Sequence, residues 1–377
     1  MLAAGALCLF CETVLDENTK PEHVLLSSLG GRKMTKRANC SGCNNHFGGT
    51  IDNELAVQVS TLRNMLQLES GTGNPPPSLR NIQAGTRKIN IKGDGCLESA
   101  DKPFTIEKLP DGKSSVKICA RSEEQLVELV PHIARALKIP EKQLREQLIA
   151  AKGSIIEQRP GAVKHAFSFG GADAIRSMVK SSLVLWSTLV GNDEVRSAPY
   201  AEARSFVMNG DISFNLNRTH LDSRSFDDIE RLKAAYGPLF NLIYIRSDET
   251  GRVIAHFTLY NAVAWQLILA ESGGTPDTRI ALISNPLEPA IWSETAAEEF
   301  DVSFEWMNNP DYSDNMVRSK KRLEGIVKYH FDVSRDKETG RLIDESFKEV
   351  GIESGAGVPS EKLHQLRVHS KSLARIA

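Results

Sequence analysis

The chain has 377 residues, of which 41% are hydrophobic and 25% are charged. This length accommodates two or three cores at roughly 150 residues per domain, and the composition of a soluble globular protein excludes disorder over most of the chain. The 46 basic and 48 acidic residues give a net charge of −2, so a polyanion would have to bind at a local basic site. Because no apolar run reaches the roughly 18 residues of a membrane span, we expect a cytoplasmic protein without membrane contacts.

Cysteine spacing is the most specific feature at the start of the chain. Four of the six cysteines form two CxxC pairs, Cys8, Cys11, Cys40 and Cys43. Each pair turns two thiolates toward one point, so two pairs can complete a closed tetrahedral zinc site. Two disulfides are the alternative, although a chain of this length without a secretory signal does not need such crosslinks. Cys96 and Cys119 stand alone, and we expect both to be buried as small apolar residues.

The N-terminal half is divided by a segment rich in glycine and proline. Apolar residues on one face predict a helix over 51–68 with Thr50 as its N-cap. Residues 70–85, which include three consecutive prolines, predict a linker. The following runs predict strands over 87–92, 104–109 and 115–120 and helices over 122–137, 140–151 and 172–190.

The C-terminal half combines both kinds of element. We expect strands over 239–246, 252–260, 279–284 and 300–306, a helix over 315–330 and a short basic helix at the C-terminus. The fold class is therefore α+β, with a small zinc module at the N-terminus and a larger mixed α+β region after it. The expected parts are the N-terminal module with its following helix over 1–69, the linker over 70–85, a β-element with helices over 86–191, and an α+β region over 192–377.

Polar residues of a particular kind lie between and after the CxxC pairs. Glu22 and Asn44 offer the hard oxygen ligands that Mg²⁺ or Mn²⁺ accepts together with water and phosphate. His23, next to Glu22, is suited to act as a general base for water that attacks a phosphodiester. His46 and Asp52 are candidates for accessory ligands or for polar surface and capping residues. The pattern indicates two metals, a structural zinc and an exchangeable catalytic cation.

These residues resemble the HNH endonuclease family in its zinc-stapled ββα-metal form, over about residues 8–53. The resemblance implies that His23 activates water, that Glu22 and Asn44 hold the catalytic metal, and that the four cysteines hold zinc. The family's central Asn has no direct counterpart, because Asn39 stands directly before Cys40 and Thr35 or Arg37 occupies the expected place. The rest of the chain resembles, more weakly, the long C-terminal extensions of bacterial stand-alone HNH proteins.

A basic loop lies inside the same module. Arg32, Lys33, Lys36 and Arg37 are candidates for phosphate contacts, with a solvated surface loop as the alternative. The first functional hypothesis is a metal-dependent endonuclease acting on nucleic acid, most simply DNA, in a phage-defence effector whose C-terminal region binds a protein partner or activator. The second is a non-catalytic zinc-stapled module that binds nucleic acid or protein, or a nuclease subunit that docks on a partner such as a short Argonaute.

Overall fold

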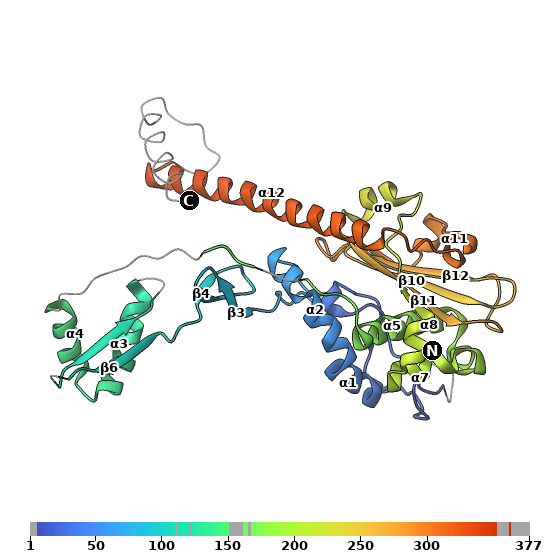
Figure 1. The fold of residues 1–377 in the computed structure, drawn as a ribbon, viewed down its shortest axis with the longest axis horizontal. Helices are drawn as coiled ribbons and strands as arrows, with labels where there is room; N and C mark the ends of the chain where they lie inside the picture. Colours follow the sequence, from blue (N-terminus) through green and yellow to red (C-terminus); the bar gives the residue numbers. More distant parts are fainter. Residues whose placement is uncertain are drawn as a thin grey trace.

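The computed structural model describes residues 6–110, 112–120, 123–150, 161–164, 167–352 and 362. At the N-terminus two short strands precede two consecutive helices (Figure 1). Strand β1 (Glu22–His23) pairs antiparallel with β2 (Met34–Thr35), so that Glu22 faces Thr35 and His23 faces Met34. A 3-10 turn, Ser27–Leu29, lies between the strands. Helices α1 (Ser41–Gly49) and α2 (Ile51–Met65) follow, which completes the predicted ββα arrangement.

Helix α2 confirms the prediction from its apolar spacing. Ile51, Leu55, Val59 and Leu62 are all buried along one face. Thr50 is the N-cap residue of α2 as expected, but its side chain makes no cap hydrogen bond and its hydroxyl donates to the carbonyl of His46 at 2.7 Å. The two helices follow each other so closely that Thr50 is both the last residue that caps α1 and the residue before α2, where its carbonyl accepts the N–H of Glu54 at 3.0 Å.

The segment after α2 forms small β-elements and two helices around a core of its own. Val130, Ile133, Ala134 and Leu144 make up that core. Strand β3 lies inside the segment 70–85 that we expected to be a linker, since Leu79 and Ala84 are buried where the strand pairs with its neighbour. Cys96 is exposed and not buried as expected. The elements are β3 (Leu79–Ala84), β4 (Arg87–Ile91), β5 (Leu97–Ser99), β6 (Phe104–Lys108), β7 (Ser114–Ile118), α3 (Glu123–Leu137) and α4 (Glu141–Ala150).

An antiparallel sheet forms the centre of the C-terminal region. Its strand order is β13-β12-β9-β10-β11-β8. The predicted strands over 239–246, 252–260 and 279–284 are confirmed, whereas β11 was not anticipated. The strands are β8 (Thr219–Leu221), β9 (Asn241–Ser247), β10 (Val253–Leu259), β11 (Val263–Ala270), β12 (Arg279–Ser284) and β13 (Trp292–Ser293).

The strand predicted over 300–306 is wrong. Its alternating apolar residues imitate a strand, but Ser303 accepts a hydrogen bond from the backbone N–H of Trp306 and caps α11 (Phe304–Asn308). Phe300, Val302 and Met307 pack under the sheet in a second core cluster, together with α9 (Ile229–Tyr236) and α10 (Ala296–Glu299).

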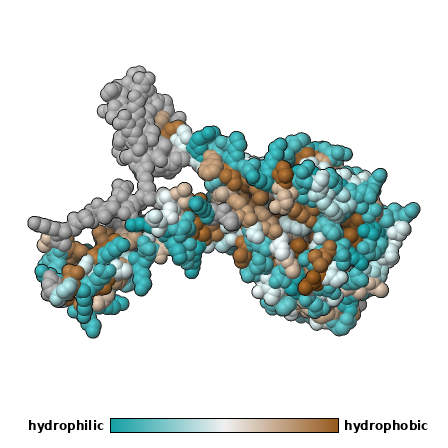
Figure 2. Space-filling view, in the orientation of Figure 1, coloured by the Kyte–Doolittle hydropathy of each residue, from teal (hydrophilic) through white to brown (hydrophobic). Residues whose placement is uncertain are grey.

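Further helices pack around the sheet, and α12 (Asn315–Glu349) begins beside the sheet and extends away from it (Figure 1). The others are α5 (Ala172–Val190), α6 (Asn192–Arg196), a 3-10 turn (Ala198–Tyr200), α7 (Ala201–Asn209) and α8 (Ile212–Arg218). Helix α12 continues well beyond the predicted 315–330, and apolar surface lies beside it in Figure 2. The predicted basic C-terminal helix falls outside the described residues. Of the helices that the structure describes, none has the length and apolar character needed to cross a bilayer.

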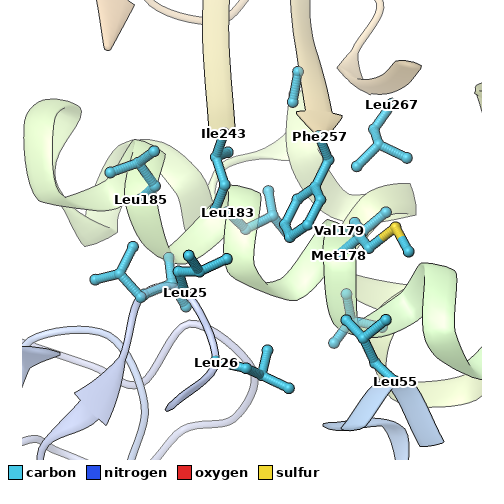
Figure 3. Close-up of a cluster of buried hydrophobic side chains, with 14 of the residues drawn as sticks. Leu25, Leu26, Leu55, Met178, Val179, Leu183, Leu185, Ile243, Phe257 and Leu267 are labelled. Atoms are coloured by element: carbon cyan, nitrogen blue, oxygen red, sulfur yellow. The ribbon is translucent and has the colours of Figure 1, made fainter. Parts of the chain in front are cut away.

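Helix α5 lies between the N-terminal module and the sheet. In Figure 3, Leu25 and Leu26 of the module approach this helix from one side, and Ile243 and Phe257 of the sheet approach it from the other. One continuous cluster of buried apolar residues includes all three layers. The N-terminal module therefore shares its core with the C-terminal region.

Candidate active site

The four N-terminal cysteines converge as the CxxC spacing predicts. Their sulfur atoms all lie within 4.8 Å of one another, and the Sγ of Cys11 is 3.6 Å from the Sγ atoms of both Cys40 and Cys43. Tetrahedral zinc with Zn–S bonds of about 2.3 Å places its sulfurs about 3.8 Å apart, so these residues fit a zinc ion. All four cysteines are free, which rules out the disulfide alternative in this structure.

Electrostatics differ between the sulfurs, and burial raises the pKa of the Cys43 thiol well above its ordinary value. Burial opposes ionisation of the Cys11 thiol, but its hydrogen bonds with Thr13, Cys40 and Cys43 lower its pKa to about 7. Burial raises the pKa of Cys8, whose Sγ accepts backbone N–H groups from Cys40 at 3.3 Å and from Phe10 at 3.5 Å. These N–H donors stabilise negative charge on sulfur, which is the form that binds metal.

Helix α6 supports the zinc site from the C-terminal region. The guanidinium of Arg196 donates to the carbonyl of Cys11 at 2.7 Å and also to that of Cys8. A second guanidinium nitrogen contacts both oxygens of Glu12 at 2.7 Å. Arg196 thus fixes the backbone between the first two zinc ligands.

Two of the three predicted catalytic residues are neighbours on β1, and the third contacts the residue before them. Glu22 and His23 form β1, and the side-chain amide of Asn44 in the first turn of α1 donates to the carbonyl of Pro21 at 3.3 Å. This hydrogen bond uses the nitrogen of Asn44 and leaves its oxygen, Oδ1, for a cation. Zinc binding at Cys40 and Cys43, directly before Asn44, would hold this arrangement in place.

His23 lies half-buried at the edge of the module. Burial lowers the pKa of its imidazole, and the positive charge of Lys180 lowers this pKa further, while the Gly31 backbone acts in the opposite direction. The Nδ1 atom of His23 is buried and has no hydrogen-bond partner in the described part of the chain. A neutral imidazole of this kind can accept a proton from water.

Glu22 has an unexpected partner from the C-terminal region. The ammonium of Lys180 on α5 lies 2.5 Å from Oε1 of Glu22 and 2.6 Å from Oδ2 of Asp52. The hydroxyl of Ser177 donates to Oδ1 of Asp52 at 2.6 Å. Lys180 is 0% exposed, and the two carboxylates raise its pKa against the effect of burial. Asp52 is thus neither a surface nor a capping residue here.

Sequence reasoning missed Lys180 and Ser177, although one signal was available. Lys180 follows Met178 and Val179 and precedes the apolar run from Leu183 to Trp186 in the most deeply buried helix. A charged residue at such a position needs a buried counter-charge. The sequence does not reveal which carboxylate supplies it, because Glu22 lies 158 residues earlier.

The basic loop is only partly available to solvent. Arg32, Lys36 and Arg37 are exposed, and Lys36 donates to the carbonyl of Glu17 at 2.9 Å. Lys33 forms an ion pair with Glu294 of the C-terminal region. The structure thus assigns Lys33 a contact between the two parts of the chain.

The place of the family's central Asn is filled differently. Thr35 lies opposite Glu22 on β2. Asn39 is fully buried, and among the described residues its side-chain Oδ1 and Nδ2 have no hydrogen-bond partner. His46 is exposed on α1, so it does not join Glu22 in the core of the module.

A pair of antiparallel strands, a helix and a four-cysteine cluster define a zinc-stapled ββα module. Residues 8–60 match the family model of the HNH endonucleases, and together with the cysteine cluster they fit an HNH endonuclease module. No curated protein and no solved structure matches the chain. The family model covers the module alone, and the α+β region that follows extends beyond it.

Proposed function

We propose that this protein is a metal-dependent endonuclease that hydrolyses phosphodiester bonds of nucleic acid, with DNA as the expected substrate. The observation that supports it is the hydrogen bond from the Asn44 side-chain amide to the carbonyl of Pro21, the residue directly before Glu22 and His23, in a module matching the HNH endonucleases. The exposed cations Arg32, Lys36 and Arg37 lie in the same module and would contact phosphates.

In the proposed reaction, His23 takes a proton from water, and the resulting hydroxide attacks the phosphorus. Glu22 and Asn44 would hold Mg²⁺ or Mn²⁺, which supplies positive charge to the phosphate and to the leaving oxygen. The residues fit such a cation, because Asn44 keeps Oδ1 available and the buried charges of Glu22, Asp52 and Lys180 sum to −1. A buried net negative charge is stabilised by a cation nearby.

A cleavage assay on plasmid, linear duplex, single-stranded DNA and RNA tests this function. Each substrate is incubated with Mg²⁺, Mn²⁺ or EDTA and with the wild type, His23→Ala or His46→Ala. Loss of the base should reduce the rate by about 10² to 10⁴. His46→Ala, an exposed histidine on the same module, should keep the wild-type rate. Equal cleavage by His23→Ala, with zinc content and circular dichroism unchanged, would refute the assignment of the base.

One observation favours a second function, a non-catalytic zinc-stapled binding module. Glu22 is only 5% exposed and already has an ammonium partner. This function predicts no metal-dependent product on any substrate with the wild type. It also predicts undiminished nucleic-acid or protein binding after Glu22 and His23 are changed together.

A further inference from the structure

We propose that Lys180 is a positioning residue of the nuclease site, supplied by the C-terminal region to hold the Glu22 carboxylate in its metal-binding orientation. This inference rests on the proposed function. It assigns part of the active-site architecture to helix α5, which lies outside the segment that matches the HNH family model.

The contacts of Lys180 reach three elements of the N-terminal module. Its ammonium binds Glu22 of β1 and Asp52 of α2, and it lies 5.8 Å from the centre of the Phe47 ring of α1. Lys180 is fully buried, and the side chains of Glu22 and Asp52 are 6% and 13% exposed. An ammonium held at this depth between two carboxylates has one position, so it fixes the orientation of both partners.

The hydrogen bond to Glu22 involves a single carboxylate oxygen. Lys180 binds Oε1, and the carboxylate has a second oxygen, Oε2, with which it can bind a cation. Hydrogen bonds to a metal-binding carboxylate commonly fix its orientation, and their loss reduces metal affinity or activity by about 10- to 100-fold. Lys180 has the geometry of such a partner.

The negative charge of Asp52 allows the ammonium of Lys180 to lie beside a metal-binding carboxylate. A lone ammonium would neutralise Glu22 and weaken its attraction for a divalent cation. Here Asp52 balances the charge of Lys180, and Ser177, on the preceding turn of α5, donates a hydrogen bond to Asp52. The pair of Lys180 and Asp52 is neutral overall, so it does not cancel the charge of an ionised Glu22, whose pKa is raised by burial.

The test compares purified zinc-loaded variants of the full chain. Lys180→Met removes the ammonium, Lys180→Arg retains a positive charge, and Asp52→Asn removes the balancing charge with little change of shape. Arg176→Met is the matched control, because Arg176 lies one turn earlier on α5 and donates to carbonyls of Val207 and Met208. Zinc content and circular dichroism establish that each variant is folded. The measurements are kcat and KM with nucleic acid, and Mn²⁺ binding by electron paramagnetic resonance.

We expect kcat of Lys180→Met to fall by about 10- to 100-fold with KM unchanged. Lys180→Arg should recover part of the rate, and Arg176→Met should keep it. Mn²⁺ binding should separate the two charge variants. Mn²⁺ binding should be tighter in Lys180→Met, where the local charge becomes −2, and weaker in Asp52→Asn, where the local charge becomes 0. A purely structural role of Lys180 would not shift Mn²⁺ affinity in opposite directions in these two variants.

Several results would overturn the inference. A wild-type rate in Lys180→Met refutes positioning, and a higher rate with tighter Mn²⁺ binding identifies Lys180 as a competitor of the metal. If Lys180→Met does not fold, Asp52→Asn decides, and unchanged kcat and Mn²⁺ affinity in that variant refute the inference. A wild type that cleaves no substrate refutes the proposed function itself, and the inference fails with it.

Discussion

The shared core predicts that the N-terminal module and the C-terminal sheet unfold together, and Leu25→Ala tests this. Leu25 belongs to the module, is 0% exposed and belongs to the cluster that also contains Leu183 of α5 and Ile243 of β9. The substitution removes three carbon atoms, which costs about 2.4 kcal/mol at 0.8 kcal/mol each, before any cavity is counted. With the cavity, we expect the free energy of unfolding to fall by about 3–5 kcal/mol.

Two probes on different parts of the chain follow the unfolding in urea. All four tryptophans (Trp186, Trp265, Trp292 and Trp306) lie in the C-terminal region, so tryptophan fluorescence reports on that region. Release of zinc to a colorimetric chelator reports on the module. Leu25→Ala should move both transitions to lower urea by the same amount, because one cooperative core contains both probes.

Leu144→Ala is the matched control. Leu144 is also buried, but it belongs to the separate cluster formed by α3, α4 and the β6–β7 hairpin. We expect this substitution to leave both transitions in place. If zinc release in Leu25→Ala shifts while tryptophan fluorescence does not, the module and the sheet unfold independently, and the argument from a shared core is refuted.

Three further predictions concern single side chains. Burial lowers the pKa of His256 from its ordinary 6.5 to about 4, so the folded protein holds its imidazole neutral. The contribution of the neutral imidazole to the free energy of unfolding is fully present above pH 6.5, and we expect that free energy to fall by about 2 kcal/mol by pH 5. Urea titrations should not find this loss in His256→Gln. Arg196→Met removes the hydrogen bonds to the backbone around the cysteine cluster, so it should accelerate zinc loss to a chelator by about 10-fold or more. Arg218→Met is the control: it removes ion pairs with Glu202 and Glu271 and should leave the rate of zinc loss unchanged. A Cβ added at Gly31 would clash with the carbonyl oxygen of Leu25, so Gly31→Ala should destabilise the protein by about 1–3 kcal/mol in thermal unfolding. A Cβ added at Gly48 has no atom within 4 Å, so Gly48→Ala should leave the stability unchanged.

Local patterns in the sequence predicted the module and several helices well. The zinc cluster follows from two CxxC pairs, and the bounds of α5 follow from an apolar run that begins after Gly170 and Gly171. Both signals are local, because the residues that carry them are neighbours along the chain or lie at a fixed spacing. The placement of Asn44 beside β1 also follows from the resemblance to a known module.

Features that depend on distant residues could not be predicted in this way. Strand β11 is buried along its whole length, so it lacks the alternation by which a half-exposed strand is recognised. Residues 300–306 have that alternation but pack under the sheet, and tertiary contacts override the local pattern. The partner of Glu22 depends on the path of the chain between α2 and α5, and no local signal determines that path.

The long separation between Glu22 and Lys180 has a consequence for how the protein is made. During synthesis at roughly 5–20 residues per second, the 158 residues between these partners take roughly 8–30 s to appear. For that time the nascent N-terminal module has neither its ammonium partner nor the apolar face of α5. The ribosome thus presents a zinc-binding segment with an exposed hydrophobic surface, and chaperones that recognise such surfaces can bind it before the chain is complete.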